Sequence, residues 1–74
     1  MHIIDRNEFP ININFAISEL QRHNFWKVIE RKRDYAIFKT KHSYIVVIIR
    51  ERSYFLEWFK SLDEAVPFVY GMII

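Results

Sequence analysis

Few residues in this 74-residue chain have the types and the spacing that catalysis or metal binding requires. The three histidines, His2, His23 and His42, are far apart in the sequence, and there is no cysteine to complete a zinc site with them. A chain with one glycine cannot form a glycine-rich phosphate loop or a G-x-S-x-G turn. Glu30 and Glu57 fall on non-adjacent predicted strands and make no acid–base pair. We therefore expect no catalytic residue, no metal, no cofactor and no enzymatic activity.

Positive charge is concentrated in the middle of the chain. Residues 25–52 hold eight Lys and Arg against three acidic residues, and both ends are slightly acidic. Two predicted turns that a meander brings to the same end of its sheet carry five of these cations: Arg31, Lys32, Arg33, Arg50 and Arg52. This set, the basic rim, is suited to binding phosphates or an acidic protein surface. Charged turns also keep sheet edges soluble, so a purely solvated rim is the alternative.

The first element that could position these groups is a helix over residues 13–23. Its apolar residues recur at the i, i+3, i+4, i+7 spacing of an amphipathic helix, at Ile13, Ala16, Ile17 and Leu20. Asn12 precedes them as a suitable N-cap. The pattern predicts a helix with one buried face.

A second helix is predicted after the apolar segment "SYFLEWF", in "KSLDEAVPF". Ser61 and Glu64 have the spacing of a capping box. Pro67 should kink this helix, and Gly71 should end it. A fifth strand, "FVYGMII", is the alternative for the same residues.

Four strands are predicted between the two helices, in "FWKVIER", "YAIFKT", "SYIVVII" and "SYFLEWF". The charged connections between them are too short for a crossover, so neighbouring strands should pair antiparallel. We expect one α+β domain over residues 1–74. Its predicted architecture is a four-stranded antiparallel meander, with an N-terminal and a C-terminal helix packed on one face.

The strands carry more apolar residues than two helices on one face can cover. "YIVVII" does not alternate, although a strand with one solvated face should. With two-residue turns, the uncovered face would carry an expected protein interface of Trp26, Tyr35, Ile37, Tyr44, Val46, Phe55 and Phe59. Such a patch exceeds what soluble monomers usually expose, which favours a homodimer or docking on another protein. Base stacking on these rings is the alternative, disfavoured by two glutamates on that face.

The composition argues against a membrane protein. No apolar run approaches the roughly 18 residues that a membrane span requires, and the N-terminus does not resemble a signal peptide. We expect a cytoplasmic protein that does not contact membranes.

Two resemblances bear on function. The run "ISELQRHNFWKVIERK" resembles the helix–turn–strand opening of HicA-type toxins, which are small ribonucleases, but the Gly-Ser-His signature of catalysis is absent and no residue role is carried over. The short, isoleucine-rich chain without cysteine is also similar in style to small bacteriophage proteins that bind and disable a host factor. We therefore expect a module that binds an acidic patch on a host protein and inhibits that protein. A small nucleic-acid-binding regulator that uses the basic rim is the alternative.

Overall fold

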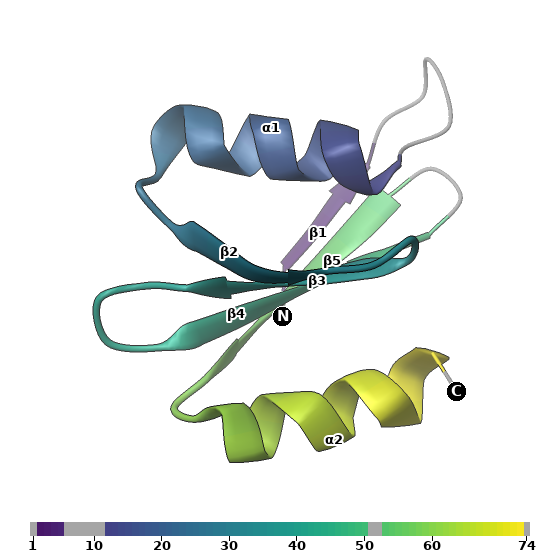
Figure 1. Ribbon diagram of the computed structural model, residues 1–74. Helices are drawn as coiled ribbons and strands as arrows, with labels where there is room; N and C mark the ends of the chain where they lie inside the picture. The colour runs from purple at the N-terminus through teal and green to yellow at the C-terminus, as the bar shows by residue number, and fades with distance from the viewer. Residues whose placement is uncertain (1, 6–11, 51–52, 74) are drawn as a thin grey trace.

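A computed structural model of the protein describes residues 2–5, 12–50 and 53–73. Its elements, drawn in Figure 1, are β1 (His2–Asp5), α1 (Ile13–His23), β2 (Lys27–Arg31), β3 (Tyr35–Lys39), β4 (Tyr44–Ile49), β5 (Ser53–Phe59) and α2 (Leu62–Ile73). The strands form one sheet in the order β1-β5-β4-β3-β2, and every neighbouring pair is antiparallel. The predicted α+β class, the two helices and the β2–β5 meander are confirmed. Strand β1, which adds to the β5 edge, was not predicted.

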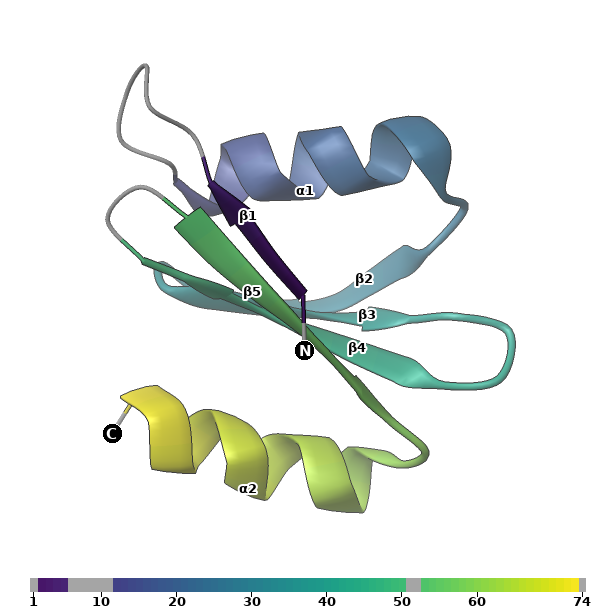
Figure 2. The same cartoon turned by 180° about the vertical axis from the view of Figure 1, so that it is seen from behind.

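The sheet lies between the two helices, with α1 on one face and α2 on the other (Figures 1 and 2). The prediction that both helices pack on one face is therefore wrong. The physical reason lies in the central strands β3 and β4, which carry apolar residues toward both faces. Burial of both faces then needs one helix on each side.

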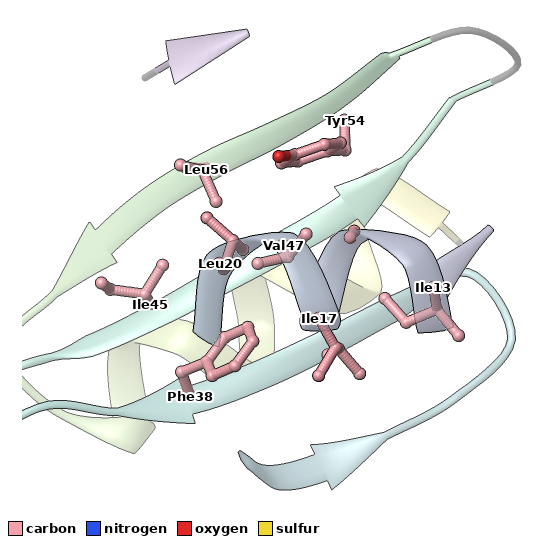
Figure 3. Close-up of a cluster of buried hydrophobic side chains, with 10 residues drawn as sticks. Ile13, Ile17, Leu20, Phe38, Ile45, Val47, Tyr54 and Leu56 are labelled. Carbon is pink, nitrogen blue, oxygen red and sulfur yellow. The ribbon is translucent and has the colours of Figure 1, made fainter. Parts of the chain in front are cut away.

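The α1 face holds the larger core. Asn12 begins the helix as predicted, and its side-chain Oδ1 accepts a 2.8 Å hydrogen bond from the Phe15 N–H. The apolar stripe of α1 packs on the sheet, as Figure 3 shows, and the ten buried residues of this α1 core are Ile13, Ala16, Ile17, Leu20, Ala36, Phe38, Ile45, Val47, Tyr54 and Leu56.

The α2 face holds a smaller core. Ala65 and Val69 of α2 are buried against three sheet residues, which complete this α2 core: Ile37, Val46 and Ile48. The helix is continuous through Pro67 and runs on to Ile73, past the end predicted at Gly71. The predicted helix is confirmed at these residues, and the alternative of a fifth strand there is wrong.

The predicted facing of side chains is right for β3, β4 and β5 and for Glu30, and wrong for the part of β2 before the bulge. The pairs Ile45–Trp58 and Phe38–Ile45 are those expected from two-residue turns. In β2 the register shifts between Val28 and Glu30. This bulge places Trp26 and Val28 against the α1 core, on the face opposite to the one predicted.

Candidate functional site

The face predicted to be an open interface is largely covered by α2. Ile37 is 2% exposed and Val46 is fully buried, so neither can contact a partner in this structure. Tyr35, Tyr44 and Phe59 are half-buried and pack against the same α2 core.

Of the two other residues of the predicted interface, Phe55 lies on the predicted face, paired with Ile48, whereas Trp26 does not. Trp26 packs on the opposite face, against the α1 core, because the bulge in β2 shifts the register of that strand. Phe55 is half-buried, and the guanidinium carbon of Arg50 lies 5.0 Å from the centre of its ring. The seven predicted residues therefore do not form one open surface.

Exposed apolar area is found instead along one side of α2. Leu62, Val66 and Tyr70 are 37%, 36% and 56% exposed, and their i, i+4, i+8 spacing aligns them on the helix. We call these three residues the α2 flank. It adjoins the buried stripe of Ala65 and Val69, so it extends the apolar face of α2 beyond the area that the sheet covers.

The α2 flank faces the β3 side of the molecule. On the other side of α2, the Phe68 ring lies 5.0 Å from the ring of Phe59 in β5. Tyr70 lies near enough to Tyr35 of β3 to act on its ionisation. The Tyr35 hydroxyl donates a 2.5 Å hydrogen bond to Glu30 Oε2. This bond, together with desolvation and the nearby charge, raises the pKa of Tyr35 to about 12.

The outer surface of α2 lacks charge beyond its first turn. The charged residues of the helix are Asp63 and Glu64 in its first turn, and none follows them through Ile73. A helix face that meets only water usually carries charged or polar residues. The sequence contains this signal, because the run "AVPFVYGMII" has no side chain that is charged at neutral pH.

Gly71 is a second unusual feature of this surface. It is exposed, its φ is not positive, and a Cβ built on it would meet nothing within 4 Å. Glycine lowers helix stability by about 1 kcal/mol relative to alanine. The packing of this chain therefore gives no reason for a glycine at position 71.

The β2–β3 turn and the end of β4, which carry the described members of the basic rim, lie together at one end of the sheet. The Ile49 N–H donates a 2.8 Å hydrogen bond to the Asp34 carbonyl oxygen, which joins the end of β4 to the β2–β3 turn. Four cations of the rim are exposed at these two turns, at Arg31, Lys32, Arg33 and Arg50. Asp34 lies among them, and the predicted fifth member, Arg52, lies outside the described residues.

The opposite end of the sheet carries two exposed aromatic residues. Phe25 is fully exposed and Trp58 is 43% exposed. Phe25 lies between the end of α1 and the start of β2, and Trp58 lies near the end of β5.

The described part of the chain has no enclosed pocket and no group of three or more His, Asp or Glu side chains that could hold a metal ion. Within the same residues, neither helix has the length and apolar character needed to cross a membrane. Comparisons with protein-family models, with curated proteins and with solved structures find no match to this chain.

Proposed function

We propose that this protein is a non-enzymatic protein-binding module that self-associates as a homodimer through the α2 flank. The observation that carries the proposal is an exposed helix surface without charge after Glu64, combined with the exposed apolar side chains of Leu62, Val66 and Tyr70. Surfaces of this composition are typical of homodimer interfaces, which are more apolar and less charged than the rest of a protein surface.

A second copy of the chain is the partner that suits this surface best. Association of the α2 flank is most favourable with another uncharged apolar surface. A charged partner surface would be dehydrated on binding without gaining an ion pair. In a two-fold dimer the same patch meets itself, so the α2 flank supplies both halves of such an interface.

The basic rim is left exposed by this mode of association. It lies at the turns of the sheet, whereas the dimer uses the side of α2. A rim of Arg31, Lys32, Arg33 and Arg50 attracts an acidic surface and raises the rate of encounter with it. The partner class that we propose for the dimer is therefore an acidic patch on a host protein, whose activity the bound module inhibits.

The experiment that tests the dimer is a measurement of molecular mass by light scattering on two variants. Val66→Glu and Tyr70→Glu each place a charge in the centre of the proposed interface, and we expect the mass to fall to that of one chain. Both side chains are exposed, so the circular dichroism spectrum should not change.

Ser18→Glu is the matched control, because it adds the same charge to the exposed face of the other helix. It should leave the dimer intact. A wild-type chain with the mass of a monomer at every concentration would contradict the proposal, as would variants that keep the wild-type mass.

A further inference from the structure

Strand β2 forms one edge of the sheet, and no described segment pairs with its outer side. The sheet order β1-β5-β4-β3-β2 gives it a neighbouring strand, β3, on one side only. Lys27, Ile29 and Arg31 are exposed along it, as expected of an uncovered edge. An edge strand presents backbone N–H and C=O groups that can hydrogen-bond a further strand.

The hydrogen bonds of β3 identify which backbone groups of β2 point outward. The N–H of Thr40, at the end of β3, donates a 2.9 Å hydrogen bond across the β3–β4 turn. Successive residues of a strand alternate in bonding direction, so Phe38 and Ala36 also direct their backbone groups toward β4. Their partners in β2 are Val28 and Arg31. The N–H and C=O groups of Val28 and Arg31 therefore point away from β3, out of the edge of the sheet.

The β2 edge is held in place by the rest of the chain. Trp26 and Val28 pack against the α1 core. The Gln21 side-chain amide donates a 3.1 Å hydrogen bond to the Trp26 carbonyl oxygen, which ties the start of the edge to α1. A strand that is already ordered loses little conformational entropy when a partner binds to it.

The side chains along this edge are mostly basic. The four cations of residues 27–34 are Lys27, Arg31, Lys32 and Arg33, all exposed. The same stretch holds two acidic residues, Glu30 and Asp34, so its net charge is +2. The Glu30 carboxylate accepts the hydrogen bond from the Tyr35 hydroxyl, on the face of the sheet that α2 covers.

The acidic side chains of the other described elements lie farther from this edge. Glu19 of α1 accepts a hydrogen bond from Tyr54 of β5, and Glu57 also belongs to β5, the third strand from β2. Asp63 and Glu64 begin α2, whose sheet contacts are chiefly with β4 and β5. A segment that approaches the β2 edge therefore meets net positive charge.

We propose that the β2 edge binds an extended acidic segment of the partner protein, which joins the five-stranded sheet as a further strand. The backbone groups of Val28 and Arg31 hydrogen-bond this segment, and the Lys27 and Arg31 side chains pair with its carboxylates. The inference rests on the proposed binding of an acidic partner, and it specifies the form of the segment that is bound.

A second copy of the chain suits this edge less well. Two β2 strands paired about a two-fold axis would place Lys27 and Arg31 of each copy near cations of the other, and like charges on paired strands are destabilising. A bulge and exposed cations on an edge strand also discourage indiscriminate pairing. Carboxylates on the added strand would make the same cations attractive.

The test uses the full chain and a synthetic peptide of alternating Glu and Val, about eight residues long. Exchange of backbone amide protons with water is followed by nuclear magnetic resonance. At a peptide concentration of about ten times the Kd, exchange of the Val28 and Arg31 amide protons should slow by about tenfold, because both become donors to the added strand.

A modified peptide separates strand pairing from attraction between charges. The same Glu–Val sequence, N-methylated at every peptide bond, keeps its carboxylates but has no backbone donor. It should bind at least about tenfold more weakly than the unmodified peptide. A peptide of alternating Lys and Val can pair but has the wrong charge, and it should not bind.

Charge variants locate the site at physiological ionic strength. Arg31→Gln should weaken binding of the Glu–Val peptide by about 1.4- to 5-fold. Lys60→Gln is the matched control and should leave the affinity unchanged, because it removes an exposed cation beyond the end of β5, far from β2. Val66→Glu should also leave the affinity of each chain unchanged, so failure of the dimer and failure of this site are distinguishable.

Three results would overturn the proposal. The first is equal binding of the N-methylated peptide, which would leave the basic rim as a binding surface for acidic groups without strand pairing. The second is unchanged exchange of the Val28 and Arg31 amide protons at saturating Glu–Val peptide, or no binding of that peptide. The third is equal binding of the Lys–Val peptide, which would show that the edge does not select an acidic segment.

Discussion

Ile37 and Phe38 are adjacent in β3 and are buried in two different cores, Phe38 beneath α1 and Ile37 beneath α2. Successive residues of a strand point to opposite faces, so this pair shows that the chain covers both faces of its own sheet. The consequence for function is that the interaction surface must be sought on the helices and at the ends and edges of the sheet.

Equal conservative truncations should distinguish the two cores from an exposed position. Ile37→Val and Ile45→Val remove one methylene from the α2 core and the α1 core, and each should lower the free energy of unfolding by about 0.5–1.5 kcal/mol. Ile29→Val makes the same change at the exposed bulge of β2 and should stay within about 0.5 kcal/mol of the wild type. Urea unfolding measures all three. An Ile37→Val variant as stable as Ile29→Val would mean that α2 does not cover the sheet.

A hydrogen bond between α1 and β5 should contribute to the attachment of that helix. The buried Tyr54 hydroxyl donates to Glu19 Oε1 at 2.6 Å, across 35 residues of sequence. Tyr54→Phe removes this donor to a carboxylate and should lower the free energy of unfolding by about 1.5–3 kcal/mol. Tyr44→Phe is the control, because the Tyr44 hydroxyl makes no hydrogen bond within the described residues. Equal stabilities of the two variants would show that the Tyr54 bond contributes nothing.

The Tyr35–Glu30 hydrogen bond predicts a loss of stability at high pH. The pKa of Tyr35 is about 12 in the folded protein against an ordinary value of 10.0. Because the folded-state pKa is the higher one, the stabilisation is complete below pH 10 and is lost as the pH rises toward 12.

Spectrophotometric titration of the four tyrosines measures this shift. The wild type should show a late-titrating group that Tyr35→Phe removes. Glu30→Gln should return this group toward pH 10, because the carboxylate that accepts the hydrogen bond is gone. A high-pH part of the titration curve that is unchanged in Tyr35→Phe would contradict the raised pKa of Tyr35.

Much of this fold could be predicted from the sequence, because the strands, the helices and two of the turns carry local signals. The charged two-residue turns fixed the pairing of β3, β4 and β5, and therefore the facing of Val46 and Val47. The side on which each helix packs could not be predicted, since β3 and β4 are apolar toward both faces. The bulge between Val28 and Glu30 contains no glycine, so no local signal predicts it. Strand β1 has only four residues, too few for a recognisable strand pattern.

The candidate site was predicted less well than the fold. The apolar strands predicted an exposed apolar surface on the sheet, at residues such as Val46, which α2 buries. The sequence shows that no charged residue follows Glu64 in α2. That these uncharged residues form an exposed surface follows only from the structure, in which one side of α2 meets the sheet. The solvent exposure of Phe25 depends on where α1 ends relative to β2, which is a tertiary property.

Gly71 should affect folding without affecting association. In the monomeric Val66→Glu background, Gly71→Ala should raise the free energy of unfolding by about 0.5–1 kcal/mol, because alanine suits a helix better and its Cβ meets open space. In the otherwise unchanged chain, the same Cβ should leave the dimer intact, because position 71 lies about 100° around the helix from Tyr70 and outside the α2 flank. Urea unfolding and a dilution series followed by light scattering measure the two effects. A dimer that Gly71→Ala weakens would place the contact on another side of α2.

The central claim is that the α2 flank of one copy packs against the α2 flank of another. An isotope-filtered nuclear Overhauser experiment on a mixture of labelled and unlabelled chains observes this contact without mutation. We predict intermolecular signals from the methyl groups of Leu62 and Val66 to the ring of Tyr70. Intermolecular signals from another surface alone, or no such signals from a chain that sediments as a monomer, would contradict the account.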